Sequence, residues 1–199
     1  MHPIQTQEFL AWAHSKGIEP DDRYEEPRCL VHKPSRDIGR FWIVPPDPAE
    51  WPHFISSMLD GLKPWATGYL WFRGGRWPGP TAPYDSDGGI RELILRGVGA
   101  PIDLEGAARF DESERDRVVA VIFAQLAFGW CCPDDLFVIP DHAETILWVD
   151  HHRVIHAKFA DRRSVKPFVR GMKANGYDLP TYLPDGTFKR QRWMKLAQD

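Results

Sequence analysis

The side chains best suited to chemistry gather between Leu136 and Phe159, a segment that contains four of the eight histidines. Its centre is the run Asp150–His152, with His142 before it and His156 after it. Imidazole and carboxylate groups can bind a metal ion, transfer protons or change a contact with pH. Polar residues in the turns of a hairpin have the same composition, and we favour this structural interpretation.

The spacing of these histidines argues against a shared ion. Alternation from Val154 to Phe159 places the apolar residues on one face of a strand. If that strand includes His152, then His152 and His156 lie together on the other face, about 13 Å apart along it. Ligands lie only about 2.0–2.1 Å from a zinc ion. We therefore expect no cofactor and no catalytic metal in this chain.

A second interpretation comes from a known family. The segment Ile146–His152, ILWVDHH, resembles the strand and following DHH motif of the DHH phosphoesterases, and Asp85 and Asp87 are similar to that family's Asp-x-Asp loop. Where the family has a His two positions before the first Asp, this chain has Pro83. The resemblance implies hydrolysis of phosphodiester or pyrophosphate bonds with Mn²⁺ or Mg²⁺, and it implies these ligands: Asp85, Asp87, Asp150 and His151, with His152.

Arginine and tryptophan form another candidate site just before a Gly- and Pro-rich stretch. Arg73 and Arg76 are flanked by Trp71 and Trp77, with two glycines between the arginines. Guanidinium groups can clamp a carboxylate or phosphate, and indole rings can stack on a planar group. The alternative is that both tryptophans pack in the core where a strand ends.

Charge is divided unevenly along the chain. Residues 1–150 have 14 Lys+Arg against 24 Asp+Glu, a net charge of −10, and residues 151–199 have 11 against 4, a net charge of +7. A basic C-terminal quarter can meet nucleic acid or an acidic partner. The sequence pI of 6.2 is low for a nucleic-acid-binding domain, so nucleic acid is disfavoured as a partner.

The three cysteines, Cys29, Cys131 and Cys132, do not suit a disulfide framework or a zinc site of CxxC pairs. No basic and apolar leader and no apolar run of about 20 residues is visible. We therefore expect a cytoplasmic protein without a membrane partner.

Periodicity and turn residues predict the elements that position these side chains. The expected helices are 6–16, 47–60, 111–128 and 164–175, and the expected strands are 29–32, 40–44, 67–72 and three in 136–159. Strands 29–32 and 40–44 should form a hairpin, residues 18–27 and 73–89 should be loops, and Ile90–Leu95 is ambiguous between helix and strand. The pattern predicts one α+β domain, residues 1–199, whose antiparallel sheet includes a C-terminal three-strand meander packed by helices. Within this domain, residues 1–89 should form a looser region and residues 90–199 a more compact one.

These observations favour a non-catalytic protein that binds another macromolecule, with a protein as the expected partner. Aromatic residues and arginine are enriched at such surfaces, and the candidate surface residues are Trp71, Arg73, Arg76, Trp77, His142, His151 and His152. In outline, the C-terminal half resembles small bacterial immunity or accessory proteins. The alternative function is the metal-dependent phosphoesterase, and the patterns predict no oligomeric state.

Overall fold

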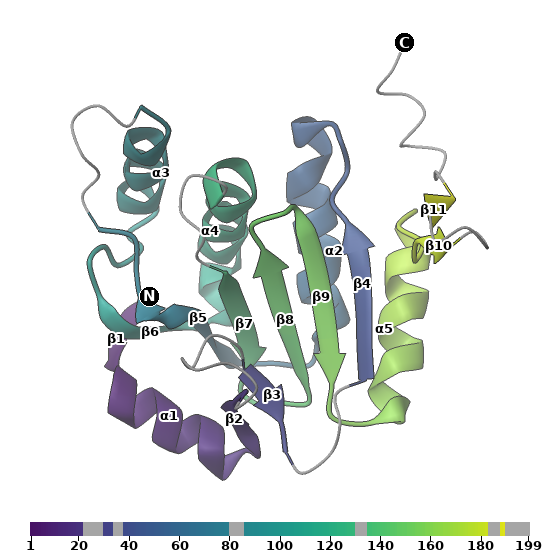
Figure 1. Cartoon of the computed structure of the whole chain (residues 1–199), viewed down its shortest axis with the longest axis horizontal. Helices are drawn as coiled ribbons and strands as arrows, with labels where there is room; N and C mark the ends of the chain where they lie inside the picture. The colour runs from purple at the N-terminus through teal and green to yellow at the C-terminus, as the bar shows by residue number, and fades with distance from the viewer. Residues whose placement is uncertain (22–29, 34–37, 80–85, 130–134, 183–187, 190–199) are drawn as a thin grey trace.

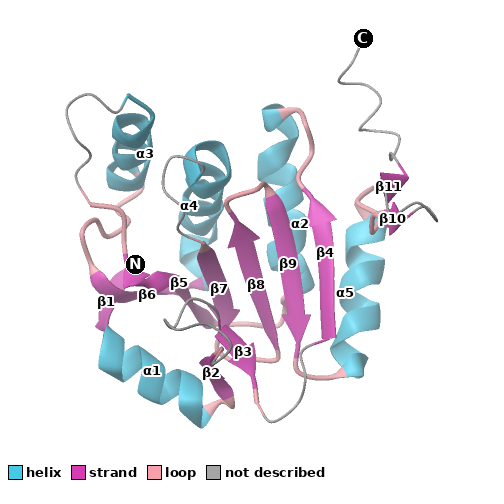
Figure 2. Cartoon of the chain, viewed as in Figure 1, coloured by secondary structure: helices cyan, strands magenta, loops and turns pink. Residues whose placement is uncertain are grey.

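A seven-stranded antiparallel sheet organises the chain in a computed structural model, which describes residues 1–21, 30–33, 38–79, 86–129, 135–182 and 188–189. The strands follow the order β1-β6-β5-β7-β8-β9-β4 across the sheet (Figures 1 and 2). Their bounds in that order are His2–Gln5, Glu105–Asp111, Thr67–Arg76, Leu136–Pro140, Thr145–Asp150, Val154–Phe159 and Ile38–Ile43. Two small antiparallel pairs are also described, β2 (Ile18–Pro20) with β3 (Leu30–His32) and β10 (Thr181–Tyr182) with β11 (Phe188–Lys189).

Five α-helices lie in the described residues: α1 Thr6–Ser15, α2 Trp51–Gly61, α3 Ser86–Gly97, α4 Arg115–Phe128 and α5 Arg162–Ala174. Helices α2, α4 and α5 contribute to the main core on one face of the sheet. Helix α1 and the β2–β3 pair cover the other face over β6, β5 and β7. The near faces of β9 and β4 have no described helix or strand in front of them (Figure 1). None of the helices in the described ranges is both long and apolar enough to cross a membrane.

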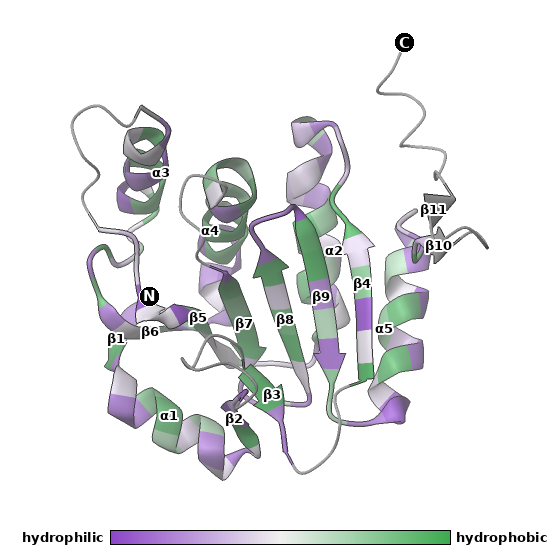
Figure 3. Cartoon of the chain, viewed as in Figure 1, coloured by the Kyte–Doolittle hydropathy of each residue, from purple (hydrophilic) through white to green (hydrophobic). Residues whose placement is uncertain are grey.

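Side-chain alternation explains why both faces of the central strands are apolar. In β7 every residue is buried, with Leu136 and Val138 in the main core and Phe137 and Ile139 in the second core under α1. Strands β7 and β8 are accordingly mostly hydrophobic in Figure 3. In β9 only the apolar set Ile155, Ala157 and Phe159 is buried, as the alternation predicts. The α+β class and the three-strand meander are therefore confirmed.

The predicted helices are confirmed with small changes at their starts. Asp47 caps a short 3₁₀ turn, Pro48–Glu50, that leads into α2, and its carboxylate accepts a hydrogen bond from Ala49 N at 2.9 Å. A second 3₁₀ turn, Glu112–Glu114, leads into α4. Helix α5 begins two residues before the predicted start because Asp161 caps it, accepting bonds from the N–H groups of Arg163 and Ser164. Local capping thus explains the starts before α2, α4 and α5, whereas α1 begins without a side-chain cap.

The predicted hairpin of residues 29–44 is wrong. Strand β3 pairs with β2, and β4 pairs with β9, which is more than 100 residues later in the sequence. Pairing with β9 buries Trp42 of β4 to 1% exposure in the main core. The predicted loop 18–27 includes strand β2, and residues 22–29 lie outside the described residues. Turn residues alone could not reveal these distant partners.

The predicted loop 73–89 is also partly wrong. Strand β5 continues to Arg76 through an irregularity in its pairing with β6, and Gly74 and Gly75 adopt φ of 70° and 75° there. The glycine pair lies where the pairing with β6 shifts register, so the strand continues through the irregularity and does not end there. Helix α3 begins at Ser86, so the ambiguous segment Ile90–Leu95 is helical, and residues 80–85 lie outside the described residues.

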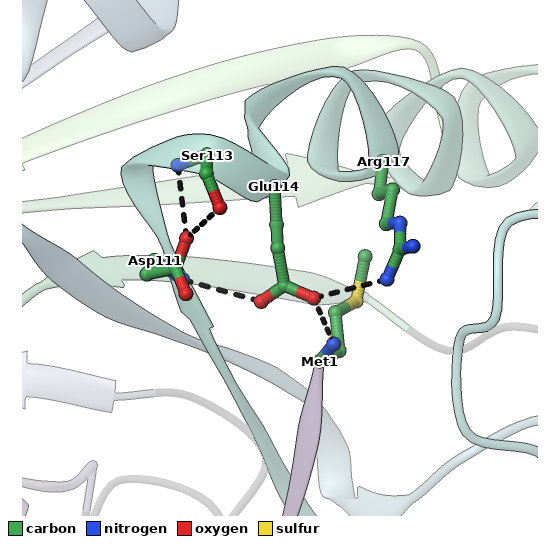
Figure 4. A network of polar contacts seen from close by, with 5 residues as sticks. All are labelled: Met1, Asp111, Ser113, Glu114 and Arg117. Atoms are coloured by element: carbon green, nitrogen blue, oxygen red, sulfur yellow. Dashed lines mark hydrogen bonds and ion pairs between the residues drawn. The ribbon is translucent and has the colours of Figure 1, made fainter.

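Glu114 joins the start of α4 to the start of the chain (Figure 4). One carboxylate oxygen accepts bonds from the Met1 amine and, at 3.1 Å, from Arg117 Nη1. The other accepts from the backbone N–H of Asp111 at 3.3 Å, which completes a capping box. Burial raises the pKa of the Glu114 carboxyl, but the bonds from the Met1 amine and Asp111 outweigh it, so the net pKa is lowered.

Glu114→Gln is therefore expected to destabilise the fold in a pH-dependent way. A carboxyl with a lowered folded-state pKa stabilises the protein above its unfolded pKa of about 4.3, and this contribution is lost as pH falls through the folded pKa. Urea unfolding should show the variant less stable than the parent at about pH 7, with the difference shrinking towards about pH 3. The control is Glu112→Gln, because the exposed Glu112–Lys63 ion pair at 3.3 Å contributes little. A difference that is constant with pH would contradict the role of the Glu114 charge.

Candidate functional site

The turn between β8 and β9 brings the Asp150–His152 run to one end of the sheet. Asp150 is the last residue of β8, and residues 151–153 form the turn, in which Arg153 has a φ of 61°. The carboxylate of Asp150 accepts a bond from the backbone N–H of His152 at 2.7 Å. His152 thus lies in a turn, and the premise that it shares a strand with His156 is wrong.

A buried carboxylate holds the first histidine of the turn. Asp135 is 3% exposed and lies just before β7, and its Oδ1 is 2.8 Å from Nδ1 of His151 and 3.3 Å from the His151 backbone N. The same oxygen accepts the bond from the His151 backbone N–H, and we assign Nδ1 of His151 as its second donor. Nε2 is then the nitrogen of this ring that remains available to a proton, an ion or a ligand.

Asp150 is surrounded by imidazoles. Its Oδ1 is 3.4 Å from Nδ1 of His151, and its Oδ2 is 3.8 Å from Nε2 of His156. Burial raises the pKa of the Asp150 carboxyl, but His156, the His152 N–H and the neighbouring imidazole charges outweigh it, so the net pKa is lowered. Asp150 is therefore a carboxylate at neutral pH.

The described residues contain one group of at least three side chains arranged to hold a metal ion, Asp150, His151 and His152, whose ligand atoms all lie within 4.8 Å of one another. The other half of the implied phosphoesterase site is not joined to it. Asp87 lies in the first turn of α3, which α4 separates from the β8–β9 turn in Figure 1, and Asp85 lies outside the described residues.

Comparisons with protein-family models, curated proteins and solved structures find no match to this chain. In the DHH run, Asp150 ends β8, whose two neighbours, β7 and β9, are both antiparallel to it, and the two histidines lie in the following turn.

A row of ring-bearing side chains crosses the sheet beside this turn. Cross-strand register aligns Trp71, Phe137, Trp148, His156 and Phe41 on β5, β7, β8, β9 and β4, and we call these five residues the aromatic row. Neighbouring ring centroids are 6.2 Å apart for Phe137 and Trp148, 4.3 Å for Trp148 and His156, and 6.0 Å for His156 and Phe41. Such cross-strand pairs stabilise a sheet.

The aromatic row passes from a covered to an open region of the sheet face. Trp71 and Phe137 are buried, and Trp71 stacks on Phe9 of α1 at 4.5 Å. Trp148, His156 and Phe41 are half-buried. Three of the five rings are thus only half-buried: Trp148 still packs against the second core, and His156 and Phe41 lie beyond it.

Two polar groups accompany the half-buried part of the row, which consists of Trp148, His156 and Phe41. Lys158 Nζ lies 4.8 Å from the Trp148 ring centroid and donates to Leu30 O at 3.1 Å. Trp148 Nε1 is buried and has no hydrogen-bond partner in the described structure. A buried donor without an acceptor is destabilising, typically by about 1–3 kcal/mol, so fold stability alone does not explain this tryptophan.

The structure separates the residues of the predicted Arg/Trp clamp. Trp71 and Trp77 are both buried, in the cores on opposite faces of the sheet, and Trp77 Nε1 donates to Gly106 O at 3.1 Å. Arg73 is half-buried, and its backbone N–H donates to Asp135 O at 2.8 Å. Arg76 is exposed and lines a pocket of about 490 Å³ with Trp77, Arg91, Asp103 and Glu105. The two indole rings therefore do not face a common ligand.

His142 lies at the opposite end of β8 from His151 and His152, in the turn after β7. Its Nδ1 accepts from Glu144 N at 3.0 Å, and its Nε2 donates to Leu62 O at 2.9 Å. These bonds connect the turn to the end of α2. The His142 ring therefore stabilises the fold.

Sequence reasoning missed Asp135, Trp148 and Phe41 as site residues. Trp148 had a detectable signal, because it alternates with the buried Leu147 and Val149 and so faces the other side of β8. Phe41 had no such signal in the sequence, since its place beside His156 depends on the β4–β9 pairing. Asp135 is brought to His151 by the β7–β8 register, which joins Leu136 to Val149.

Proposed function

We propose that this chain is a non-catalytic protein that binds another protein through the half-buried part of the aromatic row: Trp148, His156 and Phe41. The observation that supports this proposal is the continuation of the row from Trp148, at the margin of the second core, to the half-buried rings of His156 and Phe41. Aromatic side chains on a rigid sheet are typical anchors of protein interfaces, because they bury a large area at a small cost in side-chain entropy.

A protein partner fits this surface better than nucleic acid. Among the described residues, the lysine beside the row already lies over Trp148 and donates to Leu30 O. A carboxylate also lies beside the row, since Oδ2 of Asp150 is 3.8 Å from Nε2 of His156. Nucleic-acid surfaces need several cations to replace the counterions of the phosphates, so the mixed charge here favours a protein.

The proposal includes the compartment and the type of role. We place the protein in the cytoplasm, where its three cysteines would stay reduced. An immunity-like or accessory role, in which the protein masks a partner's surface, is compatible with a compact domain that presents one aromatic contact face. The phosphoesterase alternative has less support, because Asp87 lies outside the group formed by Asp150, His151 and His152.

Site-specific photo-crosslinking would test the location of this surface. A photoreactive phenylalanine analogue at position 41 is expected to crosslink one protein in the cytoplasm of the native cell. The matched position is Leu93 on α3, which is 71% exposed and hydrophobic but lies on a different element. Crosslinking from position 93 and not from position 41 would move the binding surface to α3 and overturn the proposal.

Affinity measurements with the captured protein would provide the second test. Trp148→Ala and Phe41→Ala are each expected to weaken binding at least about tenfold, which corresponds to about 1.4 kcal/mol and is typical of interface anchors. Leu93→Ala should leave the affinity nearly unchanged. Equal affinities for all three variants would contradict the role of the row, provided that circular dichroism shows each variant folded.

A further inference from the structure

We infer that the β8–β9 turn binds one divalent transition-metal ion of the zinc class through Asp150, His151 and His152. This inference is independent of the proposed binding function, since it uses different side chains and needs no partner. It also differs from the implied phosphoesterase site, because it needs neither Asp85 nor Asp87.

The three ligand atoms are already close to the spacing that an ion requires. They lie within 4.8 Å of one another. In a tetrahedral site with bonds of about 2.0–2.1 Å, ligand atoms are about 3.3–3.4 Å apart, so the three side chains must move closer together to hold an ion through Nε2 of His151. His152 is exposed in the turn, and its ring can rotate towards the other two without displacing core residues.

Asp135 provides the support that metal-binding histidines commonly have. Its bond at 2.8 Å to Nδ1 fixes the ring of His151 and leaves Nε2 for the ion. Asp135 is 3% exposed, so water does not readily replace this bond. The arrangement of carboxylate, imidazole and ion raises the basicity of the imidazole and fixes its orientation.

The donor types select the kind of ion. Two imidazoles and one carboxylate suit Zn²⁺, Co²⁺ or Ni²⁺, whereas Mg²⁺ and Ca²⁺ prefer six or more oxygen ligands. The carboxylate of Asp150 contributes one negative charge. Because the turn lies at the end of the sheet and His152 is exposed, water or a partner's side chain can occupy the fourth position.

Zinc titration of the purified, untagged chain would test this site. Isothermal calorimetry is expected to show one Zn²⁺ bound per chain, and Co²⁺ is expected to give visible absorption typical of low-symmetry nitrogen and oxygen ligands. Asp150→Asn and His152→Ala should each weaken Zn²⁺ binding by more than about tenfold, and Asp135→Asn by about 10–100-fold through the loss of support for His151. His53→Ala, an exposed histidine on α2, should bind Zn²⁺ like the parent.

The cysteines need a separate control, because thiolates bind zinc strongly. A chain with Cys29→Ser, Cys131→Ser and Cys132→Ser should keep the same Zn²⁺ affinity and give the same Co²⁺ spectrum. Loss of binding in this chain, or undiminished binding in folded Asp150→Asn and His152→Ala variants, would overturn the inference. Stoichiometric binding to the cysteine-free chain that is abolished in the double variant Asp150→Asn/His152→Ala would establish it.

Discussion

Replacing Ile122 with alanine is expected to destabilise the protein by about 2–5 kcal/mol, the usual range for deleting a buried branched side chain. Ile122 is 1% exposed on α4 and belongs to the main core with Val118 and Val121. That core also contains Leu147 and Val149 of β8, so α4 packs against the meander. The truncation leaves a cavity between two rigid layers, which relax only partially around it.

Urea unfolding measures this loss, and Val119→Ala provides the comparison within the same helix. Val119 is only partly buried beside the core, so its truncation should cost clearly less than that of Ile122. Equal losses for the two variants would mean that Ile122 does not fill a closed core position.

Gly106→Ala is expected to cost at least about 3 kcal/mol, since backbone strain of about 1–3 kcal/mol would add to a steric clash. Gly106 has a φ of 147° at the start of β6, opposite Gln5 of β1. A Cβ there would lie 2.0 Å from the backbone oxygen of Ile4, and a backbone atom cannot rotate away as a side chain can. The Gly106 carbonyl also accepts the bond from Trp77 Nε1, so a shift of this backbone would disturb the core as well.

The matched control is Gly39→Ala in the edge strand β4, where nothing lies within 4 Å of the added Cβ. This variant should keep nearly the parental free energy of unfolding. Hydrogen exchange would locate the damage, because faster exchange in β1 and β6 is expected for Gly106→Ala. Similar stability for both glycine variants would show that the close approach of β1 and β6 is not essential.

The elements found correctly from sequence are those whose signals are local. Helices α2 and α4 have capping residues and apolar runs within a few positions, and the meander has three alternating runs separated by short polar turns. Strand β6 was missed because EGAARFD contains no β-branched residue. Its Ala107 and Ala108 are buried only because β5 and β1 pair with it on both sides.

The candidate site likewise has one part that the sequence shows and one part that only the structure shows. The Asp-His-His run is visible in the sequence, but its chemistry depends on whether His152 stands on a strand or in a turn. The structure places His152 in the turn, and this brings its side chain within 4.8 Å of Asp150 and His151. The distance argument against a shared ion concerned His152 and His156 and does not apply to this group.

The sequence by itself determined the α+β class, the helix that contains Ile122 and the meander that contains Asp150–His152. Hydrophobic periodicity and capping, which predict these elements, act over a few residues. Only the tertiary structure decided that Asp135 supports His151, that Phe41 extends the aromatic row, and that Trp71 and Trp77 lie in separate cores. These relations depend on strand pairing between distant segments. Such pairing is set by the total burial and hydrogen bonding of the whole sheet, which no local pattern encodes.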